Sequence, residues 1–351
     1  MNQKLSIIMP VYNAKNTVAR SIEPLLTIRS FPLELVIVDD GSTDGTWGKL
    51  DKYAGENPCI KVIHQKNAGP GAARNTGLRN VTGTYVGFMD ADDCYIPEVL
   101  ERVWNILSSE QADAVCVGIE MIKQSDFPRE FDFGGTDSAG LTENDADQCE
   151  ASSLKDALPP GRILYQGDDS IITGREAFRR MLDGEGLDSN TYAKFYRRDK
   201  FPTDLEFFEG MLGDDIPVTY RMLLSADTVY MTKEIGYLYC VDESESSLSG
   251  IKFAPYFFDM VDRAKELYDL VLEDYPEYSE EAAGFYLDLV LQCVERILSQ
   301  ENREPYKEGL IRLLIELELH QDELKRTKHI DNRRKQEFAF FFVNKMAKEG
   351  L

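Results

Sequence analysis

The 351 residues carry a formal net charge of −23, and 43% of them are hydrophobic, which is enough for a packed core. A chain this acidic repels nucleic acid, and its overall field does not attract phosphate, so any phosphate site must be assembled locally. No apolar run reaches the roughly 18 residues of a membrane span, and the start of the chain does not have the pattern of a signal peptide. We therefore expect a cytoplasmic protein without nucleic-acid partners.

Strand and helix patterns alternate through the first 122 residues. Strands are predicted near 5–9, 34–38, 60–64, 84–89 and 113–119, and helices near 16–27, 44–54, 70–80 and 97–108. This alternation is typical of βαβ units around a mainly parallel sheet. The expected fold class is therefore α/β and Rossmann-like, with helices flanking the sheet.

The rest of the chain divides into three parts that differ in composition. Between Asp126 and Asp169 there are eleven acidic and three basic residues with little periodicity, which predicts an acidic insertion or loop over 123–170. Residues 171–250 return to mixed strand and helix patterns. Residues 251–351 have the three- and four-residue apolar spacing of helices, which predicts a C-terminal helical region.

Polar groups follow three of the predicted strands at the point where each strand ends. They are Pro10-Val11-Tyr12-Asn13, Asp39-Asp40-Gly41-Ser42 and Asp90-Ala91-Asp92-Asp93. Ligands bind outside the carboxyl ends of parallel strands, so these groups should meet in one crevice. The carboxylates of Asp90 and Asp92 are oxygen ligands suited to Mg²⁺ or Mn²⁺, and either cation would neutralise a diphosphate. Taken singly, each motif also fits a solvated loop or a turn with a helix cap.

A glycine-containing segment follows the strand at 60–64 and opens the helix at 70–80. It reads Asn67-Ala68-Gly69-Pro70-Gly71-Ala72-Ala73-Arg74-Asn75. Glycine lets the backbone approach a ligand closely, and the N-terminus of a helix attracts anions. Arg74 would then be within reach of a phosphate, although an ordinary strand-to-helix turn explains the segment equally well.

Together and in this order, the motifs between Ser6 and Pro97 resemble those of the inverting family-2 glycosyltransferases. That resemblance implies the GT-A fold with a nucleotide-sugar-binding half over 1–122, an acceptor-side half over 171–250, and a nucleotide-sugar donor, for which we expect UDP. The residues that it places around the nucleotide are Pro10, Tyr12, Asn13, Asp39, Asp40, Asn67, Gly71, Arg74, Asp90 and Ala91. It also implies that Asp92 and Asp90 are the metal ligands, with Asp92 favoured.

The resemblance continues more weakly in the second half of the chain. Tyr192-Ala193-Lys194-Phe195-Tyr196-Arg197 stands where the family often has an aromatic-Asn-Lys-Leu-Tyr-Arg stretch, and Asp214-Asp215 where it often has Glu-Asp. The second acid of that pair is the family's general base, which implies Asp215. The change to Asp-Asp leaves Asp214 as the other candidate, and both also suit the cap of a helix beginning near Ile216.

The predicted function is metal-dependent transfer of a hexosyl or N-acetylhexosaminyl group, with inversion, to a glycan or lipid-linked acceptor, as in polysaccharide biosynthesis. Single addition is favoured because Trp47 and Trp104 are the only tryptophans, so the Q-x-x-R-W motif of processive synthases is absent. Two alternatives stay open: a catalytically silent nucleotide-sugar-binding relative or scaffold, and a sugar-phosphate nucleotidyltransferase. A basic and aromatic tail over 325–346 would suit peripheral contact with the inner membrane face, or packing on the body or on a partner subunit of a homo-oligomer.

Overall fold

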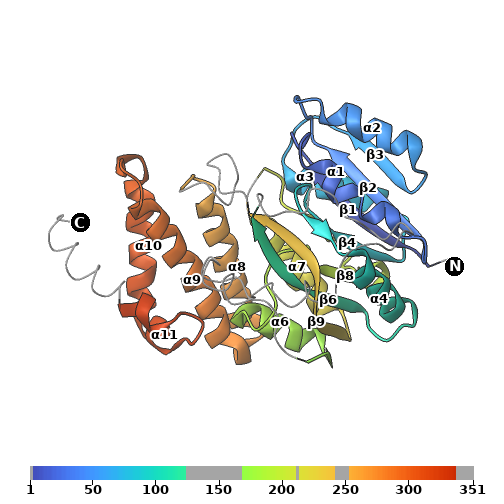
Figure 1. Ribbon diagram of the computed structural model, residues 1–351. Coiled ribbons are helices and arrows are strands. Elements are labelled where there is room, and N and C mark those ends of the chain that lie inside the picture. The colour runs from blue at the N-terminus through green and yellow to red at the C-terminus, as the bar shows by residue number, and fades with distance from the viewer. Residues whose placement is uncertain (1–2, 124–167, 211–212, 242–252, 337–351) are drawn as a thin grey trace, which may run out of the picture.

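A mixed sheet of nine strands is the centre of the part of the chain that the computed structural model describes, which is residues 3–123, 168–210, 213–241 and 253–336 (Figure 1). The strands are β1 Leu5–Val11, β2 Leu33–Asp39, β3 Ile60–His64, β4 Tyr85–Phe88, β5 Cys94–Tyr95, β6 Ala114–Lys123, β7 Ser170–Ile172, β8 Lys194–Arg197 and β9 Val229–Val241. Their order is β3-β2-β1-β4-β8-β6-β9-β5, and β7 pairs with β9.

The first half of the sheet is parallel and confirms the predicted βαβ pattern. Strand β1 lies between β2 and β4, and β2 also pairs with β3. In this register Val11 lies opposite Asp39, and Ile8 lies opposite Phe88. The segments that follow β1, β2 and β4 therefore leave the sheet at the same edge. Beyond β4 the sheet becomes mixed, because β8 is antiparallel to both β4 and β6.

Helices pack on both faces of the parallel half. They are α1 Val18–Ile22, η1 Leu25–Thr27, α2 Thr46–Glu56, α3 Pro70–Asn80 and α4 Pro97–Ser108. The single helix predicted over 16–27 is wrong, because α1 ends at Ile22 and a short 3-10 turn follows. Pro24 explains the break, since proline has no N–H to continue the helical hydrogen bonds.

The second half of the chain adds helices on one side of the sheet. They are α6 Gly174–Asp183, η3 Arg198–Lys200, α7 Asp215–Ser225, α8 Phe257–Asp274, η4 Pro276–Tyr278, α9 Ser279–Leu298, η5 Glu304–Tyr306, α10 Lys307–Leu319 and α11 Gln321–Arg326. In Figure 1, α6 and α7 lie between the sheet and the C-terminal helices. The helical character predicted for the chain after residue 250 is confirmed over the described residues.

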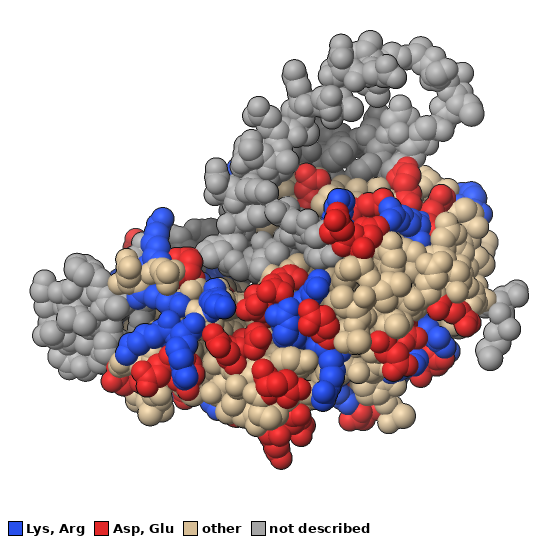
Figure 2. All heavy atoms as spheres, turned by 90° about the horizontal axis from the view of Figure 1, so that it is seen from below, with Lys and Arg blue, Asp and Glu red and all other residues tan. Residues whose placement is uncertain are grey.

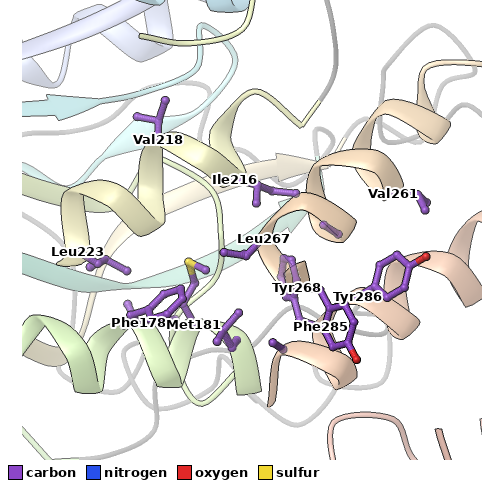
Figure 3. Packing of buried hydrophobic residues seen from close by; sticks show 14 of the residues in the cluster. Phe178, Met181, Ile216, Val218, Leu223, Val261, Leu267, Tyr268, Phe285 and Tyr286 are labelled. Atoms are coloured by element: carbon purple, nitrogen blue, oxygen red, sulfur yellow. The ribbon is translucent and has the colours of Figure 1, made fainter. Parts of the chain in front are cut away.

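One hydrophobic core joins the sheet to the C-terminal helices. Figure 3 shows Phe178 and Met181 of α6 beside Leu223 of α7, with side chains of α8 and α9 next to them. The Phe178 ring, which is fully buried, meets the ring of Tyr275 with centroids 5.6 Å apart. A second core fills the other face of the sheet, under α1, α2 and α4. The C-terminal helices are thus packed, through α6 and α7, against the sheet whose carboxyl edge holds the candidate residues.

Two predicted segments fall mainly outside the described residues. These are the acidic insertion over 123–170 and the aromatic part of the tail after residue 336. Figure 2 shows Lys and Arg side chains gathered near the C-terminal helices on one face, beside acidic ones. Within the tail, Arg334 pairs with the buried Asp288 and with Glu295, so part of the basic cluster is neutralised inside the protein. None of the described helices is long and apolar enough to cross a membrane.

Candidate active site

The loops after β1 and β2 are tied together at the carboxyl edge of the sheet. The backbone N–H of Asn13 donates to the Ser42 hydroxyl over 2.9 Å, and the Asn13 side-chain oxygen accepts from the N–H of Thr43 over 2.8 Å. Asn13 has a φ of +50°, a left-handed conformation that asparagine tolerates well. Tyr12 beside it is 52% exposed, while Pro10 is half-buried. An aromatic ring is therefore available at this edge for a flat ligand.

The two acids at the end of β2 have different partners. The buried carboxylate of Asp40 accepts from the N–H groups of Ala68 and Gly69, over 2.9 and 2.8 Å, and from the Gln65 side chain. Asp40 thus holds the segment that opens α3. Asp39, also buried, accepts from the N–H of Ser42 and lies 2.8 Å from Nδ1 of His64.

Glycines at the start of α3 allow another loop to come close. Gly69 caps the helix with a φ of +92°, and Asn67 before it is exposed. Gly71 is buried, and a Cβ added there would collide with the carbonyl oxygen of Phe208 and lie 3.1 Å from a carboxylate oxygen of Asp214. The structure therefore gives Gly71 a packing role, and its contact with a nucleotide stays a prediction.

Arg74 of α3 lies among carboxylates from two other parts of the chain. Its Nη2 is 3.0 Å from Asp90, at the end of β4, and its Nη1 is 2.9 Å from Asp214 and 3.3 Å from Asp215, at the start of α7. The Arg74 side chain is only 8% exposed. One buried guanidinium therefore connects the acid at the end of β4 with both candidate bases.

Of the two acids that begin α7, Asp215 is the more accessible. Its side chain is 17% exposed, against 5% for Asp214, and the Thr191 hydroxyl lies 3.3 Å from it. Burial raises the pKa of Asp215 to about 7, although Arg74 acts in the opposite direction. Burial likewise raises the pKa of Asp214, against the effect of Arg74. Asp214 stands at the N-cap of α7 but makes no capping hydrogen bond with its side chain, which turns to Arg74 instead.

Asp93, the last acid of the cluster after β4, anchors this loop to β9. Asp93 is fully buried and accepts from the Tyr237 hydroxyl over 2.7 Å and from the N–H of Cys240 over 2.8 Å. The same Tyr237 hydroxyl accepts from the N–H of Asp90 over 3.1 Å. Burial, with Asp92 and Asp90 nearby, raises the pKa of Asp93 well above its usual range.

Helix α1 holds the other side of this loop. Arg20 Nη2 donates to the carbonyl oxygen of Asp92 over 2.8 Å, and the Ser21 hydroxyl donates to that of half-buried Ala91 over 2.9 Å. The backbone is thereby fixed, while the side chain of Asp90 is 32% exposed and that of Asp92 is exposed.

These carboxylates fit a cation that shares its ligands with a substrate. Oxygen donors suit Mg²⁺ or Mn²⁺. The described residues contain no group of three or more His, Cys, Asp or Glu side chains arranged to hold a metal. Magnesium sites of nucleotide enzymes often use only one or two carboxylates, together with phosphate oxygens and water. Asp90 and Asp92 are therefore adequate only if a diphosphate completes the site.

Most of the residues that support the site have no signal of their own in the sequence. Arg20, Ser21 and Tyr237 belong to no motif and lie far along the chain from the acids that they hold. Asp93 was visible only as the fourth residue of the acidic cluster. Thr191 stands beside the weakly matching stretch that begins at Tyr192, which is the one signal for it in the sequence.

Comparison with known proteins gives the family of the N-terminal part. Residues 6–149 match the family model described as glycosyl transferase family 2. This part of the chain is a family-2 glycosyltransferase domain. YibD of Escherichia coli (strain K12), an uncharacterized glycosyltransferase, is 28% identical over 248 residues, which cover 70% of this chain and 63% of YibD. EpsJ of Bacillus subtilis (strain 168), also uncharacterized, is 35% identical over 127 residues, 36% of either protein. The chain thus spans less than two thirds of these curated relatives.

A solved structure shows the same fold over nearly the whole of this chain. TarS 1-349 of S. aureus, solved in complex with UDP-GlcNAc, has a TM-score of 0.63 and 18% identity, covering 95% of this chain and 83% of the TarS chain. The predicted GT-A fold is confirmed.

Replacing Gly71 by Ala should loosen the site. The new methyl group collides with the Phe208 carbonyl, and we expect the free energy of unfolding in urea to fall by about 1–3 kcal/mol, as for other overpacked positions. Gly48→Ala on α2 is the control: its Cβ meets nothing within 4 Å, and alanine should stabilise that helix by about 0.5–1 kcal/mol. Equal unfolding midpoints for the two variants would contradict this account of Gly71.

Replacing Arg74 by Met should leave Asp90, Asp214 and Asp215 without their common cation. We expect a loss of about 3–5 kcal/mol in unfolding free energy near pH 8. The loss should shrink as the pH falls, because protonated carboxylates no longer need the guanidinium. Adding Asp214→Asn to this variant should restore part of the stability. Urea unfolding at pH 8 and pH 6 measures both effects. If the loss of unfolding free energy is the same at both pH values and Asp214→Asn does not reduce it, the charge argument is refuted.

Proposed function

We propose that this chain moves a hexosyl or N-acetylhexosaminyl group from a nucleotide-sugar, with UDP as the expected nucleotide, to a hydroxyl group of a glycan or lipid-linked acceptor, inverting the anomeric centre. The observation that carries the proposal is the position of Asp215. Its carboxylate lies 3.3 Å from Nη1 of Arg74, and Nη2 of the same guanidinium pairs with Asp90. A candidate base and a donor-side acid are thus held by one group. The fold shared with TarS, which was solved with UDP-GlcNAc, supports a UDP-linked donor.

In this proposal Asp215 is the general base. A sugar hydroxyl is a poor nucleophile at neutral pH, and a carboxylate within hydrogen-bond reach accepts its proton as attack proceeds. A pKa of about 7 suits that task better than the pKa of an ordinary aspartate, since the base works best near the ambient pH. Arg74 and Thr191 orient the carboxylate, and Asp214 balances the charge of Arg74. Attack from the side opposite the nucleotide inverts the anomeric centre.

The donor would bind along the carboxyl edge of the sheet. We assign the exposed ring of Tyr12 to the base, and Asp39 to a polar contact with the base or ribose. Pro10, Asn13, Asn67 and Ala91 complete the nucleotide side. Asp92 and Asp90 would hold Mn²⁺ or Mg²⁺, and such a cation, when bound, stabilises the charge of a departing diphosphate.

Asp215→Asn should abolish transfer while preserving donor binding. An amide cannot accept the acceptor's proton, so we expect kcat to fall by about 10²–10⁴ with the Kd for UDP-sugar unchanged. In the parent protein kcat/KM should fall about tenfold per pH unit below pH 7, because protonated Asp215 is inactive, and level off above it. Asp204→Asn, an exposed acid on the preceding loop, is the control. Undiminished transfer by Asp215→Asn would exclude Asp215 as the base.

Donor binding should depend on a divalent cation. Among UDP-, GDP- and dTDP-sugars tested with Mn²⁺, we expect the UDP-sugar to raise the melting temperature and to be hydrolysed slowly, and EDTA to remove both effects. Asp92→Asn should weaken the Mn²⁺-dependent part of the thermal shift, because it removes a charged oxygen ligand. Release of pyrophosphate from a nucleoside triphosphate would favour a nucleotidyltransferase instead. Tight UDP binding without turnover would favour a silent relative.

A further inference from the structure

A histidine connects two acids beside the predicted base pocket. His64 ends β3, and its Nδ1 lies 2.8 Å from a carboxylate oxygen of Asp39 on β2. Its Nε2 lies 3.0 Å from a carboxylate oxygen of Asp51 on α2. The indole of Trp47, also on α2, meets the imidazole ring edge-on with centroids 6.4 Å apart. The ring therefore joins an acid of the site to one outside it.

Both ring nitrogens face acceptors, and this arrangement favours the protonated ring. A neutral imidazole has one N–H and one lone pair, so it can donate to only one of the two carboxylates. The imidazolium ion donates to both. The hydrogen bond to Asp51 has the largest effect and raises the pKa of His64. Burial lowers this pKa by less, and the hydrogen bond to Asp39 raises it further. The two acceptors therefore favour the charged form of the ring next to Asp39.

We propose that Asp51, His64 and Asp39 form a positioning relay that holds the Asp39 carboxylate toward the base of the donor nucleotide. This inference rests on the proposed function, because it needs a nucleotide docked at this edge. Asp39 touches the base in this arrangement, whereas His64 and Asp51 act through Asp39 and are positioning residues.

The relay gives the site a chemical preference among bases. An ionised carboxylate only accepts hydrogen bonds. Asp39, which also accepts from the N–H of Ser42, would therefore bind a base that presents a ring N–H, as uracil does. A base that presents a lone pair at the same place, as cytosine does, is repelled. An aspartate free to rotate would discriminate less, since it could turn away from the lone pair.

The exposed fractions of the three side chains distinguish this positioning role from a purely structural one. The side chains of His64 and Asp51 are 41% and 52% exposed, and that of Asp39 is 4% exposed. Exposed ion pairs contribute little to stability. Removing the imidazole should therefore hardly change folding, but it releases one side of Asp39. A structural role would instead appear in the melting temperature and leave the choice of base unchanged.

The test compares UDP and CDP binding to the full chain with Mn²⁺ by calorimetry. His64→Ala should weaken UDP binding about threefold to tenfold, the usual effect of one hydrogen bond, while CDP binding is not weakened and kcat at saturation is unchanged. Asp51→Asn should act in the same direction with a smaller effect. Lys52→Ala, on the same helix and away from His64, is the control and should match the parent. Melting temperatures should agree among all four proteins.

The pH dependence supplies a second measurement. Two charged groups act on the ring, Asp39 from β2 and Asp51 from α2. UDP affinity of the parent should fall as the pH rises through the pKa of His64, because the neutral ring serves only one carboxylate. Titration of the His64 ring by NMR gives that pKa independently, and Asp51→Asn should lower it. In His64→Ala the UDP affinity should no longer fall as the pH rises through this range.

The outcomes distinguish the relay from the function on which it rests. If the parent binds no nucleotide at all, the proposed function fails. If the parent prefers UDP and His64→Ala keeps the same UDP:CDP ratio and pH step, the relay is wrong and the function stands. Should His64→Ala not fold, Asp51→Asn decides: an unchanged UDP:CDP ratio together with a lowered His64 pKa would also overturn the relay.

Discussion

A single buried guanidinium compensates the acids of this site. Arg74 lies within 3.3 Å of carboxylates from the end of β4 and the start of α7, and its own side chain is almost completely covered. Carboxylates in such surroundings are costly unless a cation accompanies them. The protein as a whole has a formal net charge of −23, so its overall field does not stabilise these carboxylates. The positive charge must therefore be placed locally, and Gly71 allows α3 to approach closely enough to place it.

The charge of Arg74 does not by itself orient the acids. Other parts of the fold hold them in position. The loop that carries Asp90 and Asp92 is held on one side by α1 and on the other by Tyr237 of β9. Strand β9 in turn belongs to the sheet whose face packs on α6, α7 and the C-terminal helices. Segments that contribute no proposed catalytic group thus decide where the acids point. This is preorganisation, in which the protein rather than the ligand bears the cost of ordering the site.

Much of the parallel half could be predicted because its signals are local. Apolar strands ending in Asp39-Asp40 and Asp90-Ala91-Asp92-Asp93 appear where expected, and their acids meet at one edge because parallel strands end together. The break at Pro24 is also local, because proline ends α1 without any distant contact. In contrast, no neighbouring residue indicates that Asp40 would hold the α3 loop or that Arg74 would lie between acids. Those roles depend on contacts across as many as 140 positions.

The sequence by itself determined the α/β class, the resemblance to family-2 glycosyltransferases and the set of candidate acids, because strand periodicity and the groups after each strand are read from neighbouring residues. Only the tertiary structure decided how these acids are partnered: Asp214 with Arg74, Asp93 with Tyr237, and Asp39 with His64. The physical reason is that a carboxylate's charge state and direction are set by burial and by the donors around it. Those donors come from α1, α3, β3 and β9, which the fold brings together.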